Sequence, residues 1–175
     1  FDLAEAVKRA AVLQPIEVKA ETLTQIHDFL TGRLSVVLKE SYRYDVVDAV
    51  LAEQSANPAA AARAVKQLQA WIGREDWSSI LPGYARCVRI IRSAGGSVQS
   101  SVISDQLAEP EEKNLYQALN VERLTFNDVN DFLNTVVKLI PAINAFFDKV
   151  LVMAEDEKVK QNRLALVGQI ANLSR

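Results

Sequence analysis

The chain has 175 residues, of which 49% are hydrophobic and 24% are charged, and its formal net charge at pH 7 is −2. This length and composition fit one folded unit with a single core, so we expect one domain over residues 1–175. The lone cysteine, Cys87, and the lone histidine, His27, exclude an intrachain disulfide, a cysteine-based zinc cluster and most histidine-based catalytic sets.

Turn residues are scarce, with six Gly and five Pro in the chain, and residues that favour helices fill periodic segments. An all-α fold follows, a helical bundle of about nine helices. In chain order, the predicted helices cover residues 3–12, 22–42, 45–53, 57–71, 76–93, 109–119, 125–138, 141–153 and 156–173.

Several local signals support these boundaries. Asn57 and Pro58 are an N-cap residue followed by a proline at the first helical position. Pro82 and Gly83 predict a kink within the fifth helix. Pro110 and the acids beside it suit a first helical turn, where the helix dipole favours negative charge.

The sequence offers little catalytic chemistry. We expect His27 to be a hydrogen-bonded residue at the edge of a core, and Cys87 to be a small buried hydrophobe. Gly95 and Gly96 lack the following Lys-Ser or Lys-Thr of a phosphate loop. We therefore predict no catalytic residue, no metal site and no cofactor in this chain.

The position of basic residues is more informative than the net charge. Arg86, Arg89 and Arg92 project along one arc of their predicted helix, opposite its apolar stripe. Phosphate groups would relieve the repulsion among them, and Arg63 and Lys66 are weaker candidates for phosphate contacts. The rings of Trp71, Trp77 and Tyr84 are nearby in sequence and suit stacking on unpaired bases. The alternative is a solvated face that is paired with the carboxylates of neighbouring helices.

Arg163 lies on the apolar side of the last predicted helix, close to Val159, Leu166 and Ile170 on a helical wheel. A charge in such a place is costly unless it is paired. We predict a structural ion pair from Arg163 to Asp148 or to an acid of residues 155–157. The predicted pair would fix the last helix against the one before it.

Five segments follow one another along nearly the whole chain and together carry a resemblance to a known family. They are FFDKVLVMAEDEKVKQNRLALV at 146–167, LTQIHDFLTGRLSVVLKE at 23–40, YDVVDAVLA at 44–52, YARCVRIIR at 84–92 and AEPEEKNLYQAL at 108–119. In this arrangement the chain resembles the C-terminal end of the glycyl-tRNA synthetase beta subunit of bacteria and organelles. The last domain of that subunit is an all-helical, DALR-type anticodon-binding module.

The resemblance implies that the chain is the C-terminal fragment of a longer enzyme that joins glycine to tRNA(Gly), with ATP and Mg²⁺. It implies two partners, the anticodon region of tRNA(Gly) and an alpha subunit in an (alpha-beta)2 assembly. Amino acid activation in that family belongs to the alpha subunit, so the fragment alone is expected to be non-catalytic. The expected location is the cytoplasm, or an organelle if the source is a plastid, and no membrane or DNA partner is expected.

Two alternatives remain open at this point. YARCVRIIR also resembles the equivalent helix of arginyl-tRNA synthetases, which share the module. A helical protein-interaction scaffold, in which the arginines face acids, is the other alternative.

Overall fold

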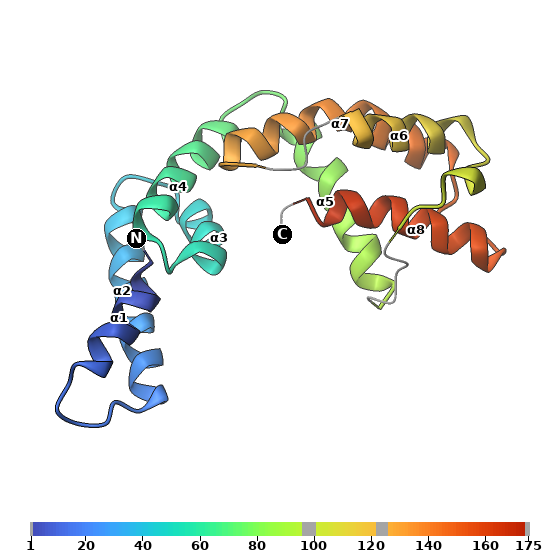
Figure 1. Cartoon of the computed structure of the whole chain (residues 1–175). Helices are drawn as coiled ribbons and strands as arrows, with labels where there is room; N and C mark the ends of the chain where they lie inside the picture. The colour runs from blue at the N-terminus through green and yellow to red at the C-terminus, as the bar shows by residue number, and fades with distance from the viewer. Residues whose placement is uncertain (1, 96–100, 122–125, 174–175) are drawn as a thin grey trace. The chain divides into compact units, whose positions relative to one another are not determined.

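The computed structural model describes residues 2–95, 101–121 and 126–173 (Figure 1). The described residues contain α-helices and one short 3-10 helix but no strand, which confirms the predicted all-α fold. The elements are α1 Leu3–Val12, α2 Ala20–Lys39, α3 Tyr44–Gln54, α4 Pro58–Ile72, α5 Trp77–Ser93, η1 Ser104–Gln106, α6 Pro110–Val121, α7 Val129–Lys149 and α8 Glu157–Ala171. None of the described helices is both long and apolar enough to span a membrane.

The described residues contain one α-helix fewer than the sequence predicted. The predicted helices 125–138 and 141–153 are a single helix, α7, that continues through Pro141. Pro141 is on the exposed side of this helix, where water can hydrate a carbonyl that has no helical partner, whereas Leu139 and Ile143 are fully buried. Burial of apolar side chains before and after the proline therefore stabilises the helix across it. Gly96 and the predicted helix start at residue 125 lie outside the described residues.

The chain divides into two compact units, Phe1–Arg74 and Glu75–Arg175. Unit 1 contains α1 to α4, in which each helix packs on the next one in sequence. Its core is formed mainly by α3 and α4, and includes Val46, Val47 and Val65. Asn57 caps α4 as predicted, because its side-chain oxygen accepts a hydrogen bond of 3.0 Å from the Ala60 N–H.

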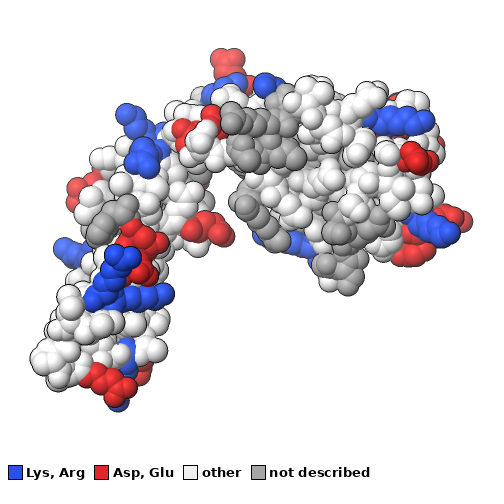
Figure 2. Space-filling view, in the orientation of Figure 1, with Lys and Arg blue, Asp and Glu red and all other residues white. Residues whose placement is uncertain are grey.

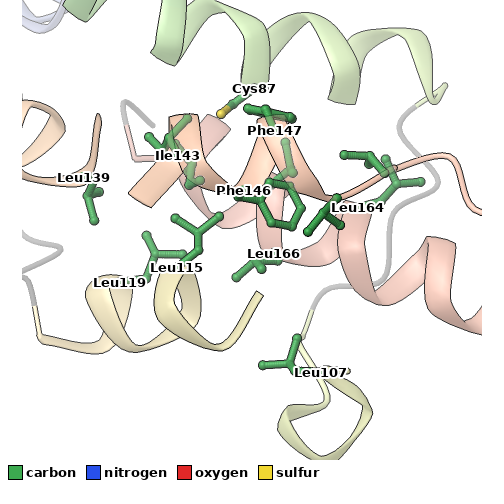
Figure 3. Close-up of a cluster of buried hydrophobic side chains, with 14 of the residues drawn as sticks. Cys87, Leu107, Leu115, Leu119, Leu139, Ile143, Phe146, Phe147, Leu164 and Leu166 are labelled. Carbon is green, nitrogen blue, oxygen red and sulfur yellow. The ribbon is translucent and has the colours of Figure 1, made fainter. Parts of the chain in front are cut away.

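Unit 2 contains α5 to α8 and a continuous apolar core (Figure 3). Helices α5 and α6 both pack on α7 and α8. The core includes Phe146, Phe147, Val150 and Val152 of the C-terminal segment. Figure 3 shows Phe146 at the centre of this cluster, between side chains from α6 and α8.

Gly83 allows α5 to pack closely on α7. A Cβ atom at this position would lie 2.7 Å from the Cδ1 of Ile140. Gly32, in α2, has no atom within 4 Å of the equivalent point. The two helical glycines therefore differ in the space around them.

We expect Gly83→Val to lower the stability of the chain by about 1–3 kcal/mol, because the new methyl groups would overpack the contact between α5 and α7. Gly32→Val is the matched control, since it makes the same change in a helix with open space around it. Its effect should stay within about 0.5 kcal/mol. Urea unfolding of both variants checks this, and equal effects would contradict the close contact.

Candidate nucleic-acid interface

Arg86, Arg89 and Arg92 are all exposed on α5, and we call them the arginine ridge. The buried face of the same helix carries Ile80 and Cys87. No Asp or Glu occurs between Trp77 and Ser93, the bounds of α5. Within the described part of the chain, none of the three arginines forms an ion pair. The ridge is therefore a local positive surface whose charge is not neutralised by neighbouring carboxylates.

Arg86 is also held by an aromatic ring. Its guanidinium carbon lies 4.2 Å from the centroid of the Phe147 ring of α7. A cation–π contact of this kind uses the face of the guanidinium group and leaves its N–H edges available to a ligand. Phe147 thus positions one member of the ridge.

Arg63 and Lys66 are exposed on α4 in unit 1. They are about one helical turn apart, so they form a small basic site of their own. On the face visible in Figure 2, basic and acidic side chains lie beside one another in several places, and large areas carry neither. The positive charge is local, in agreement with the net charge of −2.

The aromatic side chains that the sequence suggested for base stacking are only partly available. Trp71 is 5% exposed, so the prediction that it stacks on a base is wrong. Tyr84 is half-buried, its hydroxyl donates to the Ala171 carbonyl over 3.3 Å, and its ring packs edge-to-face on Phe132. Trp77 is half-buried. Sequence proximity to the arginines did not indicate which rings the core would take up.

Arg163 forms a buried ion pair, but its partner is Glu112 of α6. The predicted partner, Asp148, is exposed near the end of α7. The side chains of Arg163 and Glu112 are 11% and 2% exposed. The pair joins α8 to α6, which is not the helix that precedes it in sequence. This corrects the predicted arrangement.

Two further atoms of this ion pair, one on each partner, also form hydrogen bonds. Glu112 Oε2 accepts hydrogen bonds from the N–H groups of Ala108 and Glu109, over 2.7 and 2.9 Å. Arg163 Nη1 donates to the Leu151 carbonyl over 2.9 Å. Glu112 is the third residue of α6 and reaches back to the residue before the helix, as in a capping box. An acid three residues after Glu109, the residue before the helix, is the local sequence signal that indicates this cap.

His27 and Cys87 have the structural surroundings that their positions suggested. His27 Nε2 lies 3.4 Å from the Ser55 hydroxyl, and the histidine is half-buried. Cys87 is fully buried, and its burial raises the pKa of the thiol to about 12. Among the described residues, no group of three or more His, Cys, Asp and Glu side chains is arranged to hold a metal ion.

Known proteins resemble this chain along most of its length. The profile of the DALR anticodon binding domain matches residues 80–174, which is more than half of the chain and nearly all of unit 2. The chain is 34% identical to the Arabidopsis thaliana glycine–tRNA ligase, chloroplastic/mitochondrial 2, over 94% of this chain and 16% of that protein.

Two bacterial proteins have similar sequence identity to this chain. The chain is 35% identical to the glycine–tRNA ligase beta subunit of Myxococcus xanthus, over 85% of this chain and 22% of the relative. It is 37% identical to the beta subunit of Anaeromyxobacter dehalogenans strain 2CP-1, over 89% of this chain and 23% of that relative. The chain thus spans less than a quarter of the length of these relatives.

Arg163→Ala should destabilise the chain by about 3–5 kcal/mol, because it leaves the Glu112 carboxylate buried without its counter-charge. Lys160→Ala is the control on the same helix, since Lys160 pairs with the largely exposed Glu157. Its cost should not exceed about 1 kcal/mol. Urea unfolding measures both, and a cost for Arg163→Ala as small as that of the control would contradict a structural role for the pair.

Alkylation of Cys87 should be slow in the folded chain at pH 8, because a thiol with a pKa of about 12 is almost entirely protonated there. In urea the thiol should recover an ordinary pKa near 8.5 and react much faster. Iodoacetamide labelling followed by mass spectrometry measures the two rates. Rapid labelling of the folded chain would contradict the buried position.

Proposed function

The chain belongs to the DALR anticodon-binding domain family, and from this we propose that it binds the anticodon region of tRNA(Gly) as a domain of a glycine–tRNA ligase beta subunit. The binding function and the choice of tRNA come from the family and from the names of the relatives. The domain would contribute affinity and recognition, while the joining of glycine to tRNA takes place elsewhere in the enzyme.

The observation that carries this proposal is the arginine ridge within the part of the chain that matches the family. Three exposed arginines on an α5 without acids repel one another, and phosphate oxygens bound by their guanidinium groups would remove that repulsion. The absence of ion pairs from the ridge to other described residues favours a ligand over the carboxylate-paired alternative. Arg63 and Lys66 remain weaker candidates for additional phosphate contacts.

The activity of the whole enzyme is part of the same proposal. We propose that the longer protein uses ATP and Mg²⁺ and assembles with an alpha subunit. The location would be the cytoplasm or an organelle, and the name of the Arabidopsis relative, chloroplastic/mitochondrial, is consistent with the second.

A scaffold function is the competing candidate, and one observation favours it. Phe29, Val36 and Val37 of α2 are 66%, 56% and 60% exposed, which is unusual for large apolar side chains on one helix. Such a face suits contact with another protein. It is located in unit 1, outside the segment that the family profile matches.

The Arg89→Ala/Arg92→Ala variant should bind a tRNA(Gly) anticodon stem-loop more weakly than the parent chain. The slope of log K against log salt concentration should become less steep by about 0.7–0.9 for each phosphate that the variant no longer binds. Adding Arg86→Ala should weaken binding further. Fluorescence anisotropy at several salt concentrations gives both the affinity and the slope.

Lys8→Ala/Lys19→Ala is the matched control, because it removes the same charge from exposed positions in and beside α1 and α2. It should leave the slope nearly unchanged. A tRNA(Arg) stem-loop and an unrelated hairpin complete the comparison. Equal binding of all three RNAs would contradict recognition of tRNA(Gly), and no binding to any of them would favour the scaffold function.

A further inference from the structure

A groove lies between η1 and α6 in unit 2, and most of its lining residues take no part in the core or in the arginine ridge. Its volume is ≈ 510 Å³, which is within the range of about 300–1,000 Å³ of small-ligand pockets. Leu107, which is buried, and Tyr116, which is half-buried, contribute its apolar surface. The polar lining residues are Ser104, Lys113, Gln117 and Asn120.

The groove lies at the edge of the core, because Leu107 belongs to the core cluster and Tyr116 packs against it. Leu115 and Leu119 of the same helix are fully buried and point toward α7 and α8 in Figure 3. Lys113, Gln117 and Asn120 are exposed. The helix is held at its first turn by the Glu112–Arg163 ion pair, so the groove is built on a fixed element.

The polar lining has one positive charge and no carboxylate. Lys113 makes no ion pair with any residue that the structure describes. Asp105 of η1 is adjacent in sequence to Ser104 and accepts a hydrogen bond of 3.3 Å from the Ser104 hydroxyl. The groove therefore combines an unpaired cation with side-chain amides.

We propose that this groove binds one unpaired nucleobase of the RNA together with a neighbouring phosphate, and this assignment rests on the proposed function. The Tyr116 ring provides the surface on which the base stacks. The amides of Gln117 and Asn120 donate to and accept from the edge of the base. Lys113 binds the phosphate as a point charge.

Each chemical feature of the groove has a counterpart in such a nucleotide. An apolar peptide segment would leave the two amides and Lys113 without partners, which is unfavourable once the groove excludes water. An anion alone would not use the surface of Leu107 and Tyr116. A nucleotide has an aromatic face, a hydrogen-bonding edge and a negative charge, and so satisfies all three parts of the lining.

The groove and the arginine ridge belong to different helices. Helices α5 and α6 each pack on α7 and α8, but α5 and α6 have no substantial contact with each other. A stem-loop that reaches both would place its phosphate backbone on α5 and an unstacked base at α6. The ridge would then supply affinity and the groove would supply base recognition.

The test compares anticodon stem-loops that lack one loop base at a time, with the whole chain and fluorescence anisotropy. Removing the bound base should weaken binding to the parent chain by about 5- to 100-fold, the usual range for removal of base–aromatic stacking. Tyr116→Leu keeps an apolar side chain in the groove but lacks the aromatic face. In this variant, removal of that base should have little further effect, because the interaction is already absent.

A second groove variant keeps the proposal open to contradiction if Tyr116→Leu folds poorly. Gln117→Ala/Asn120→Ala changes exposed side chains only and should reduce the penalty for removing the same base. Asn114→Ala is the matched control, since Asn114 is an exposed amide of α6 outside the groove. Tyr116→Phe should bind as the parent does, and these variants should leave the salt slope unchanged, because none of them removes a charge.

The outcomes separate the groove from the proposed function. If the groove variants bind every stem-loop as tightly as the parent while the Arg89→Ala/Arg92→Ala variant binds weakly, the groove assignment is wrong and tRNA binding stands. If the parent chain binds the tRNA(Gly) stem-loop no better than an unrelated hairpin, the proposed function fails and the groove assignment fails with it.

Discussion

A carboxylate from α6 and a guanidinium group from α8 meet inside unit 2, and the arrangement of its helices depends on this contact. Either charge alone would be costly in the core, so each requires the other to be in place. Glu112 also accepts two backbone N–H groups at the start of α6, and Arg163 donates to the Leu151 carbonyl between α7 and α8. One ion pair thus connects a helix start, a second helix and a loop.

The helical wheel placed Arg163 on the buried side of its helix correctly, but it did not identify the acid across from it. A wheel describes one helix, and the choice of partner depends on which helix packs against that side. The acids nearest in sequence were Asp148 and residues 155–157, whereas Glu112 is 51 residues away. Glu112 itself was interpreted as a helix-dipole acid, and its position three residues after Glu109 indicates a cap with equal force. Local patterns could not predict an ion pair between residues so far apart in the sequence.

Local patterns predicted most of the helices because many of their starts and stops are decided by neighbouring residues. The capping at Asn57 and the first turn at Pro110 follow from such residues. The error at Pro141 has a tertiary cause, since the cost of a proline within a helix is outweighed by burial of Leu139 and Ile143 around it. The same reasoning explains Trp71, whose ring is buried in unit 1 although its sequence position suggested an exposed stacking surface. Burial depends on contacts that are distant in sequence.

The arginines that the structure describes in unit 2 have different environments, and ionic strength affects them differently. Arg163 is buried with its counter-charge, where salt screens the interaction only weakly. Arg89 and Arg92 are exposed on a helix without acids, so mobile ions screen them and phosphate groups can displace those ions. Arg86 is intermediate, because Phe147 holds its guanidinium face while the edges stay exposed. A change in salt concentration therefore alters the interaction of the ridge with a polyanion, while the buried contact that holds α6 to α8 is preserved.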